Sequence, residues 1–110
     1  MKKFKKPWGG EKEFVLNGKC TVKILEVKPY QMFSLQYHKK RVEEWYFLTD
    51  GIAQIGLKKK KYKKGDFLKI KAGVAHRLIA GKKKVQVLEI SYGKWIKKDI
   101  VRIEDKYGRS

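Results

Sequence analysis

The sequence contains few of the features that mark secreted or membrane proteins. Cys20 is the single cysteine, so no intramolecular disulfide can form. No segment approaches the roughly 18 consecutive apolar residues expected of a membrane span. The N-terminus lacks the apolar stretch of a signal peptide. These absences predict a cytoplasmic chain with no membrane partner, in which Cys20 is a small strand residue rather than a nucleophile.

Acidic residues are scarce beside basic ones. The chain has 29 Lys and Arg against 11 Asp and Glu, a formal net charge of +18, and only four of the basic residues are arginine. Such a surface attracts anions in a salt-dependent way. Because base recognition relies on arginine forks, specific nucleic-acid binding is not expected. The lysine-rich segment 57–64 is predicted to be a solvated hairpin turn. Lysine-rich coding bias and adaptation to heat would both give this surface, and the sequence does not separate them.

No long helix is indicated either. Short segments rich in Val, Ile, Leu and aromatic residues alternate with turn signals, including Asn17-Gly18 and Asp50-Gly51, which are typical of hairpins. The segment 99–110 fits a strand or a turn of helix. Eight short strands predict an all-β jelly roll that forms one domain over 1–110, with no nucleotidyltransferase domain and no Walker-type phosphate loop. The expected strands are 13–17, 20–28, 32–38, 43–48, 51–57, 65–70, 77–80 and 85–91.

Only two histidines are present, and each lies in a short polar motif. His38 belongs to the segment 34–45 and His76 to the segment 65–76. On a strand over 32–38, the two-residue period places Gln36 and His38 on one face. On the following strand, Glu43 shares a face with the aromatic residues two and four positions later, while Glu44 faces outward. A carboxylate buried among aromatic rings requires a compensating cation or hydrogen bonds.

A divalent metal ion would supply that compensation. The proposed ligands are Gln36, His38, Glu43 and His76. Mixed nitrogen and oxygen ligands suit zinc, manganese, cobalt, nickel or iron, and the sequence does not choose among them. Taken singly, each histidine could instead form a hydrogen bond in a barrel wall or lie on the surface. Candidate ligands at matching positions in two separate motifs favour the metal.

Several segments carry a family resemblance that covers almost the whole chain. They include Lys-Pro-Trp-Gly at 6–9, Ser-Leu-Gln-Tyr-His at 34–38 and the closing run 99–109. The chain resembles cupins of the type II mannose-6-phosphate isomerase family, which also forms the C-terminal domain of bifunctional mannose-1-phosphate guanylyltransferases. The resemblance implies a cupin jelly roll that binds a metal through the four residues named above. It also implies interconversion of mannose 6-phosphate and fructose 6-phosphate through an enediol.

The resemblance further implies which cations meet the sugar phosphate. Arg102 and Arg109 occupy the arginine positions of the closing run, and the planar guanidinium suits a phosphate. We expect Arg102 to act in catalysis and Arg109 to bind substrate. Lys40 and Arg41 follow His38 directly, so they could add positive charge at the pocket, or they could lie on a solvated turn.

The reaction also needs a base that moves a proton between two sugar carbons. Glu89 is the first candidate because its strand should face the barrel, and Glu44 is the second. Alternatively, Glu89 faces solvent and pairs with a lysine. The segment after Glu43 is one residue longer than the common family pattern, which leaves Glu44 as an alternative metal ligand as well.

Five positions depart from the family pattern. Lys39, Lys40 and Glu44 fall where members often carry histidine, while Lys71 and Ala80 replace a usual proline and asparagine. These changes could alter the substrate or abolish catalysis. The alternatives are therefore a non-catalytic cupin that binds a sugar phosphate or another small anion, and another metal-dependent cupin enzyme such as a glucose-6-phosphate isomerase or a dioxygenase. A homodimer through a sheet face or an exchanged edge strand is a further expectation.

Overall fold

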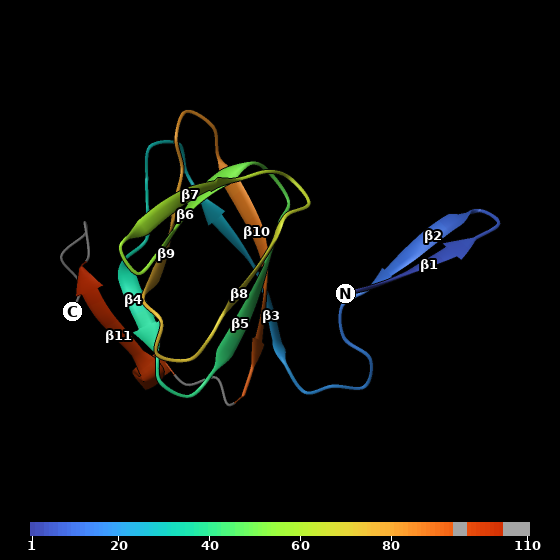
Figure 1. The fold of residues 1–110 in the computed structure, drawn as a ribbon, viewed down its shortest axis with the longest axis horizontal. Coiled ribbons are helices and arrows are strands. Elements are labelled where there is room, and N and C mark those ends of the chain that lie inside the picture. Colours follow the sequence, from blue (N-terminus) through green and yellow to red (C-terminus); the bar gives the residue numbers. More distant parts are fainter. Residues whose placement is uncertain (94–96, 105–110) are drawn as a thin grey trace.

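The computed structural model describes residues 1–93 and 97–104, and the all-β class expected from the sequence is confirmed (Figure 1). Within that part of the chain, no helix has the length and apolar character to cross a membrane. Among the described residues, one 3-10 turn, η1 (Lys97–Asp99), precedes the strand at Ile100–Glu104. The strands are β1 (Lys2–Lys6), β2 (Gly9–Glu13), β3 (Thr21–Val27), β4 (Leu35–His38), β5 (Val42–Phe47), β6 (Gly51–Ile55), β7 (Lys58–Tyr62), β8 (Phe67–Ile70), β9 (His76–Ile79), β10 (Val85–Tyr92) and β11 (Ile100–Glu104).

Two antiparallel sheets enclose the interior. The four-stranded sheet has the order β3-β10-β5-β8, and the five-stranded sheet has the order β11-β4-β9-β6-β7. Strand β10 is central in the first sheet, where Val87 lies opposite Leu25 of β3 and Phe47 of β5. The chain passes from one sheet to the other between β5 and β6. This arrangement is the jelly roll of a cupin, as the sequence predicts.

The interior is formed by every second side chain along the strands. On β5, Glu43, Trp45 and Phe47 are all buried and point inward, while Glu44 is only half-buried and points outward. The strand parity expected for Glu43 is therefore confirmed. Apolar side chains fill one end of the barrel and polar side chains the other. The apolar cluster comprises Val27, Trp45, Phe47, Ala53, Ile70, Leu78, Ala80, Val85 and Val87.

The lysine-rich segment is a strand rather than the predicted solvated turn. Residues Lys58–Tyr62 form β7, which pairs with β6 at the edge of the five-stranded sheet. The lysine side chains stay exposed, so only the backbone pairing contradicts the prediction. Tyr62 anchors the strand, because its ring stacks on Phe47 with centroids 4.8 Å apart. Lysines on an edge strand also hinder pairing with foreign strands.

The N-terminal region differs from the prediction too. No strand covers 13–17; instead β1 and β2 pair as a hairpin whose charged sequence lacks an apolar alternation. Asn17, at a φ of 52°, lies in the connection from β2 to β3, and these strands do not pair. Asp50-Gly51 also does not close a hairpin, because it joins β5 and β6 of different sheets. At the other end of the chain, the segment 100–104 adopts the strand alternative.

Candidate metal centre

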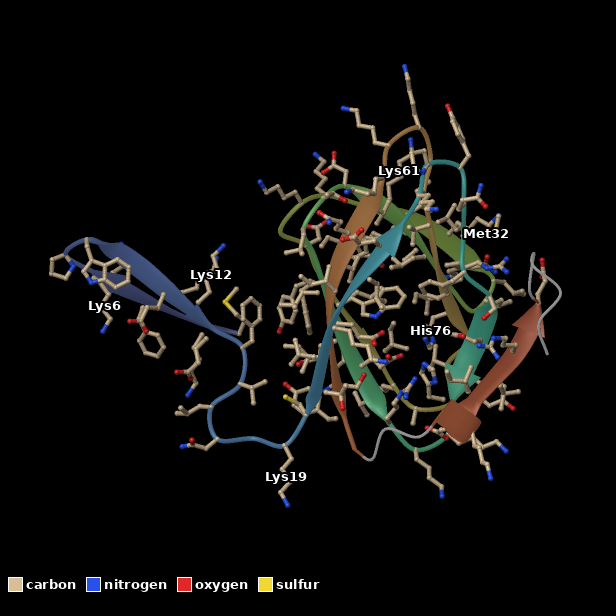
Figure 2. The ribbon with its side chains drawn as sticks, turned by 180° about the vertical axis from the view of Figure 1, so that it is seen from behind. Lys6, Lys12, Lys19, Met32, Lys61 and His76 are labelled. Carbon is tan, nitrogen blue, oxygen red and sulfur yellow. The ribbon has the colours of Figure 1, made fainter. Side chains whose placement is uncertain are left out.

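Two histidine rings converge on one buried carboxylate inside the barrel. His38 ends β4, Glu43 lies on β5 and His76 begins β9. Figure 2 shows the His76 side chain pointing into the barrel. The distance to Glu43 Oε1 is 2.9 Å from His38 Nε2 and 3.1 Å from His76 Nε2. One donor atom from each residue lies within 4.8 Å of the others. The fold therefore brings together three of the four ligands expected from the sequence.

The hydrogen bonding of His76 indicates what this cluster accommodates. His76 Nδ1 lies 2.9 Å from the Val74 carbonyl oxygen and donates a hydrogen bond to it. In the neutral ring, Nε2 then carries a lone pair that faces a lone pair of Glu43 Oε1. A proton or a metal ion between these atoms removes the repulsion. Two imidazoles and a carboxylate are ligands for divalent transition metals, so the residues fit such an ion.

Glu43 is an anion in this site. Burial alone would raise the pKa of its carboxyl, but hydrogen bonds with the ring nitrogens of His38 and His76, each of which requires a proton between the two atoms, outweigh burial and lower the pKa well below its ordinary value. The second carboxylate oxygen, Oε2, accepts a 3.3 Å hydrogen bond from Ser91 Oγ. The buried charge is thus compensated from three different strands.

Gln36 lies beside this cluster on β4. Its Cα is paired with that of His76 on one side and with that of Arg102 on the other. Its side-chain oxygen accepts a 2.8 Å hydrogen bond from Ser34 Oγ, which restricts the orientation of the amide. Gln36 and Glu43 line the same cavity. Ligation by Gln36 stays a prediction.

That cavity has a volume of about 230 Å³ and opens between the two sheets. The carboxylates of Glu43 on β5 and Glu89 on β10 line it. The cations are Lys23 on β3, Arg41 between β4 and β5, and Arg102 on β11. A small polar molecule could therefore contact two of the proposed metal ligands, Gln36 and Glu43, together with a second carboxyl group and arginine side chains. The lining residues are Lys23, Leu25, Phe33, Ser34, Gln36, Arg41, Glu43, Glu89, Ile100 and Arg102.

Glu89 faces the interior, so the alternative of a solvent-facing residue is wrong. Its carboxylate Oε2 accepts a 3.0 Å hydrogen bond from Trp45 Nε1. Burial raises the pKa of Glu89 to about 8, and the neighbouring Glu43 carboxylate contributes to the rise. The structure does not bring Glu44 to the cluster, because Glu44 lies on the outer side of the sheet near Tyr46 and Tyr92.

Arg41 is buried, which excludes the solvated turn for its side chain. Its Nη2 atom lies 3.0 Å from His38 Nδ1, and its Nε atom lies 4.0 Å from Glu43 Oε2. The next residue toward the N-terminus, Lys40, is exposed and fits the solvated alternative. Of the two arginines expected from the closing run, Arg102 lines the cavity from β11. Arg109 lies outside the described residues.

Asp99 is a structural residue that sequence reasoning missed. It is buried in η1, where its two carboxylate oxygens accept hydrogen bonds of 3.0 and 3.2 Å from the backbone N–H groups of Lys39 and Lys40. It thereby fixes the turn that carries His38 and Arg41 into the site. Ser91 was also missed, although it continues the inward alternation of β10 two residues after Glu89.

Comparisons with known proteins agree with this architecture. Residues 1–105 match the family described as "Mannose-6-phosphate isomerase C-terminal". The xanthan biosynthesis protein XanB of Xanthomonas campestris is 34% identical over 113 residues, which cover 99% of this chain and 24% of XanB. A mannose-1-phosphate guanylyltransferase of Klebsiella pneumoniae is 34% identical over 110 residues, covering 94% and 23% respectively. The chain thus spans about a quarter of the length of these relatives.

A solved structure supports the fold independently. A cupin protein from Bacteroides fragilis superimposes with a TM-score of 0.61 and 17% sequence identity, covering 81% of this chain and 92% of that protein. At this identity the likeness concerns the fold alone. The two sheets and the cavity between them are accordingly a cupin barrel.

Proposed function

The chain belongs to the mannose-6-phosphate isomerase C-terminal family, and from this premise we propose that it is a metal-dependent isomerase of mannose 6-phosphate and fructose 6-phosphate. One observation carries the proposal. Glu43, the carboxylate of the His38, Glu43 and His76 cluster, lines one cavity together with a second buried carboxyl group and an arginine of the closing run. These are the groups that an aldose–ketose phosphate isomerisation needs.

The reaction moves a proton between C1 and C2 of the sugar through an enediol. Negative charge develops on the two sugar oxygens as the proton leaves carbon. A divalent metal held by Gln36, His38, Glu43 and His76 would polarise these oxygens and stabilise that charge. The protein must then supply an acid–base group and a cation for the phosphate.

Glu89 is the acid–base group in this proposal. It lines the cavity but is outside the ligand cluster, so its carboxyl group remains able to exchange a proton with the substrate. The hydrogen bond from the Trp45 indole orients one carboxylate oxygen. Burial and the neighbouring Glu43 carboxylate raise the pKa of Glu89 to about 8, which suits a group that takes up and releases a proton near neutral pH. Glu44, the second candidate base, lies on the wrong side of the sheet.

Arginine side chains are the proposed phosphate anchors. Arg102 lines the cavity, and a guanidinium can donate two parallel hydrogen bonds to a phosphate. Arg41 lies among the metal ligands and adds a second cation at the same end of the cavity. Arg109 is included because of its place in the closing run. Lys40, whose side chain is exposed, would contribute only to the positive electrostatic potential around the cavity.

The guanylyltransferase activity named for one relative belongs to a protein about four times as long as this chain. A cytoplasmic location is part of the proposal because Cys20 is a free thiol.

A coupled assay of mannose 6-phosphate turnover tests the proposal. The protein is treated with a chelator and then assayed alone and after addition of zinc, manganese, cobalt, nickel or iron(II). We expect fructose 6-phosphate to form only when a metal is restored. Glucose 6-phosphate is assayed as an alternative substrate, because its turnover would identify the protein as a glucose-6-phosphate isomerase instead. If the folded protein shows no turnover with any metal but binds mannose 6-phosphate by calorimetry, the isomerase is refuted and the chain is a non-catalytic binding cupin.

A further inference from the structure

Lys23 is a cation of the cavity that has no part in the reaction described above. It lies on β3, the strand at one edge of the four-stranded sheet, and it lines the cavity together with Glu89 and Arg102. Its neighbours Val22 and Ile24 point outward and are 55% and 58% exposed. The two-residue period of a strand therefore directs the Lys23 side chain toward the interior.

Lys23 is the first member of a row of side chains that crosses the four-stranded sheet. Its Cα is paired with that of Glu89 on β10, and Glu89 is paired in turn with Trp45 on β5. Directly opposite residues of antiparallel strands project from the same face of a sheet. Because Glu89 and Trp45 are buried inside the barrel, this row runs along the inner face from the edge of the sheet toward its middle.

A matching row crosses the five-stranded sheet, which forms the opposite wall in Figure 1. Arg102 on the edge strand β11 is paired with Gln36 on β4, and Gln36 is paired with His76 on β9. The two rows meet at their third members, because the rings of Trp45 and His76 pack edge-on with centroids 5.5 Å apart. Each row therefore begins at an edge strand and ends at this contact.

The first members of the two rows, Lys23 and Arg102, consequently face each other across the opening of the cavity. Both side chains line the cavity, one from each sheet. The second members, Glu89 and Gln36, lie one strand further in, a step of about 5 Å. A phosphate group held between the two cations would leave the carbon chain attached to it beside the acid–base group and the metal ligands.

We propose that Lys23 and Arg102 form the two halves of one phosphate site at the cavity rim, and that Lys23 makes the chain selective for phosphorylated monosaccharides. The inference rests on the proposed function and extends it by a residue from the opposite wall. A phosphate monoester carries about −1.5 to −2 charges at pH 7, which one arginine does not balance. The exposed ammonium group of Lys23 supplies the second cation and three donors. Arg41 does not take this place, because its Nη2 atom lies 3.0 Å from His38 Nδ1, at the metal ligands.

Calorimetry with mannitol 1-phosphate, the alcohol obtained by reducing mannose 6-phosphate, tests the site. This probe has no carbonyl group, so it binds without being isomerised. We expect Lys23→Met to weaken its binding by about 10-fold, the effect of losing one hydrogen bond to a charged group, while Lys23→Arg retains most of the affinity. Lys69→Met is the matched control: it removes the same charge from an exposed lysine on β8, opposite Glu44 on the outer face, and should change the affinity by less than about twofold. Circular dichroism checks folding, and Lys23→Gln replaces Lys23→Met if that variant is not folded.

Combining Lys23→Met with Arg102→Ala shows whether the two groups share one phosphate. Once either cation is lost the phosphate is held loosely, so the double variant should lose less affinity than the product of the two single losses. Losses that simply multiply, equal affinities for Lys23→Met and Lys69→Met, or an unmodified chain that does not bind mannitol 1-phosphate would each overturn the site. A chain without turnover on any metal, in which Lys23→Met still weakens binding about 10-fold, would uphold the site and refute only the isomerase.

Discussion

The two ends of the barrel interior share strands but differ in chemistry. Strand β5 buries Phe47 at one end and Glu43 at the other, and β10 buries Val85 at one end and Ser91 at the other. Both strands keep the same inward alternation throughout. The apolar end stabilises the fold through burial of hydrocarbon. The polar end opposes stability, because buried charges must be compensated. The two ends therefore differ in their contribution to folding: the apolar end stabilises the fold, and the polar end holds charges whose burial must be offset by their partners.

The polar end is held in place by partners from several strands. Glu43 contacts His38 of β4, His76 of β9 and Ser91 of β10. Glu89 accepts its hydrogen bond from Trp45, whose ring belongs to the apolar cluster and also packs edge-on against His76 at 5.5 Å. Trp45 thus joins the two ends, with its hydrocarbon on one side and its indole N–H on the other.

The largest effect that separates the two ends is expected from His76→Ala. The change removes one of the three clustered donor atoms, so we expect the protein to lose its bound metal and all turnover while the β fold stays largely intact. Metal content after dialysis, the coupled assay and far-UV circular dichroism measure these three properties. A purified variant that keeps its metal and its rate would show that the ligand assignment is wrong.

The next largest effect is a loss of turnover in a variant, Glu89→Gln, that keeps its metal. For Glu89→Gln we expect turnover to fall by about 10²- to 10⁴-fold, because the amide cannot exchange a proton with the substrate. The metal content should not change, since Glu89 is outside the ligand cluster. Glu26→Gln is the control: Glu26 is an exposed carboxylate on β3 that accepts a 3.0 Å hydrogen bond from Gln86. Equal turnover in the two variants would remove Glu89 from the mechanism.

Phe47→Ala, at the apolar end, should lower stability and leave metal binding unchanged, which is the opposite of the result expected for His76→Ala. Deleting this buried ring, which stacks on Tyr62, should lower the free energy of unfolding by about 3–5 kcal/mol. The metal affinity of the folded variant should stay unchanged. Urea denaturation and metal titration measure the two quantities, with the exposed Leu57→Ala as a control expected within about 0.5 kcal/mol of the unmodified chain. A loss of metal affinity in Phe47→Ala would show that the two ends are coupled.

The same contrast explains what the sequence could predict. The jelly roll and the inward parity of Glu43 follow from a two-residue alternation, which is a local signal. The pairing of the lysine-rich strand β7 does not follow from it. That strand is held by backbone bonds to β6 and by the contact between Tyr62 and Phe47, which are distant in sequence. The β1–β2 hairpin was missed for a related reason, because its charged residues carry no apolar pattern.

At the site, sequence motifs located the residues but not their partners. His38, Glu43 and His76 lie in recognisable motifs, and the fold brings them together. Asp99 was missed because its role depends on the backbone N–H groups of Lys39 and Lys40, about 60 residues away in sequence. A backbone N–H group can donate from almost any residue type, so these hydrogen bonds leave no residue pattern at the donor's end. The difference between buried Arg41 and exposed Lys40 was hidden because it depends on the side-chain contacts of Arg41 with His38 and Glu43, which the folded turn creates.

The smallest effect in this series concerns phosphate binding at the rim of the polar end. Arg102 lines the cavity from β11, and a hydrogen bond to a charged group contributes about 1.5–3 kcal/mol. Arg102→Ala should therefore weaken the affinity for mannose 6-phosphate by about 10- to 100-fold, while affinity for unphosphorylated mannose stays the same. Arg102→Lys should recover only part of the loss, because an ammonium group lacks the planar fork. Lys40→Ala, at an exposed side chain, should change the affinity by less than about twofold. If calorimetry gives Arg102→Ala the same affinity as Lys40→Ala, the phosphate is bound elsewhere, and the polar end then serves the sugar oxygens alone.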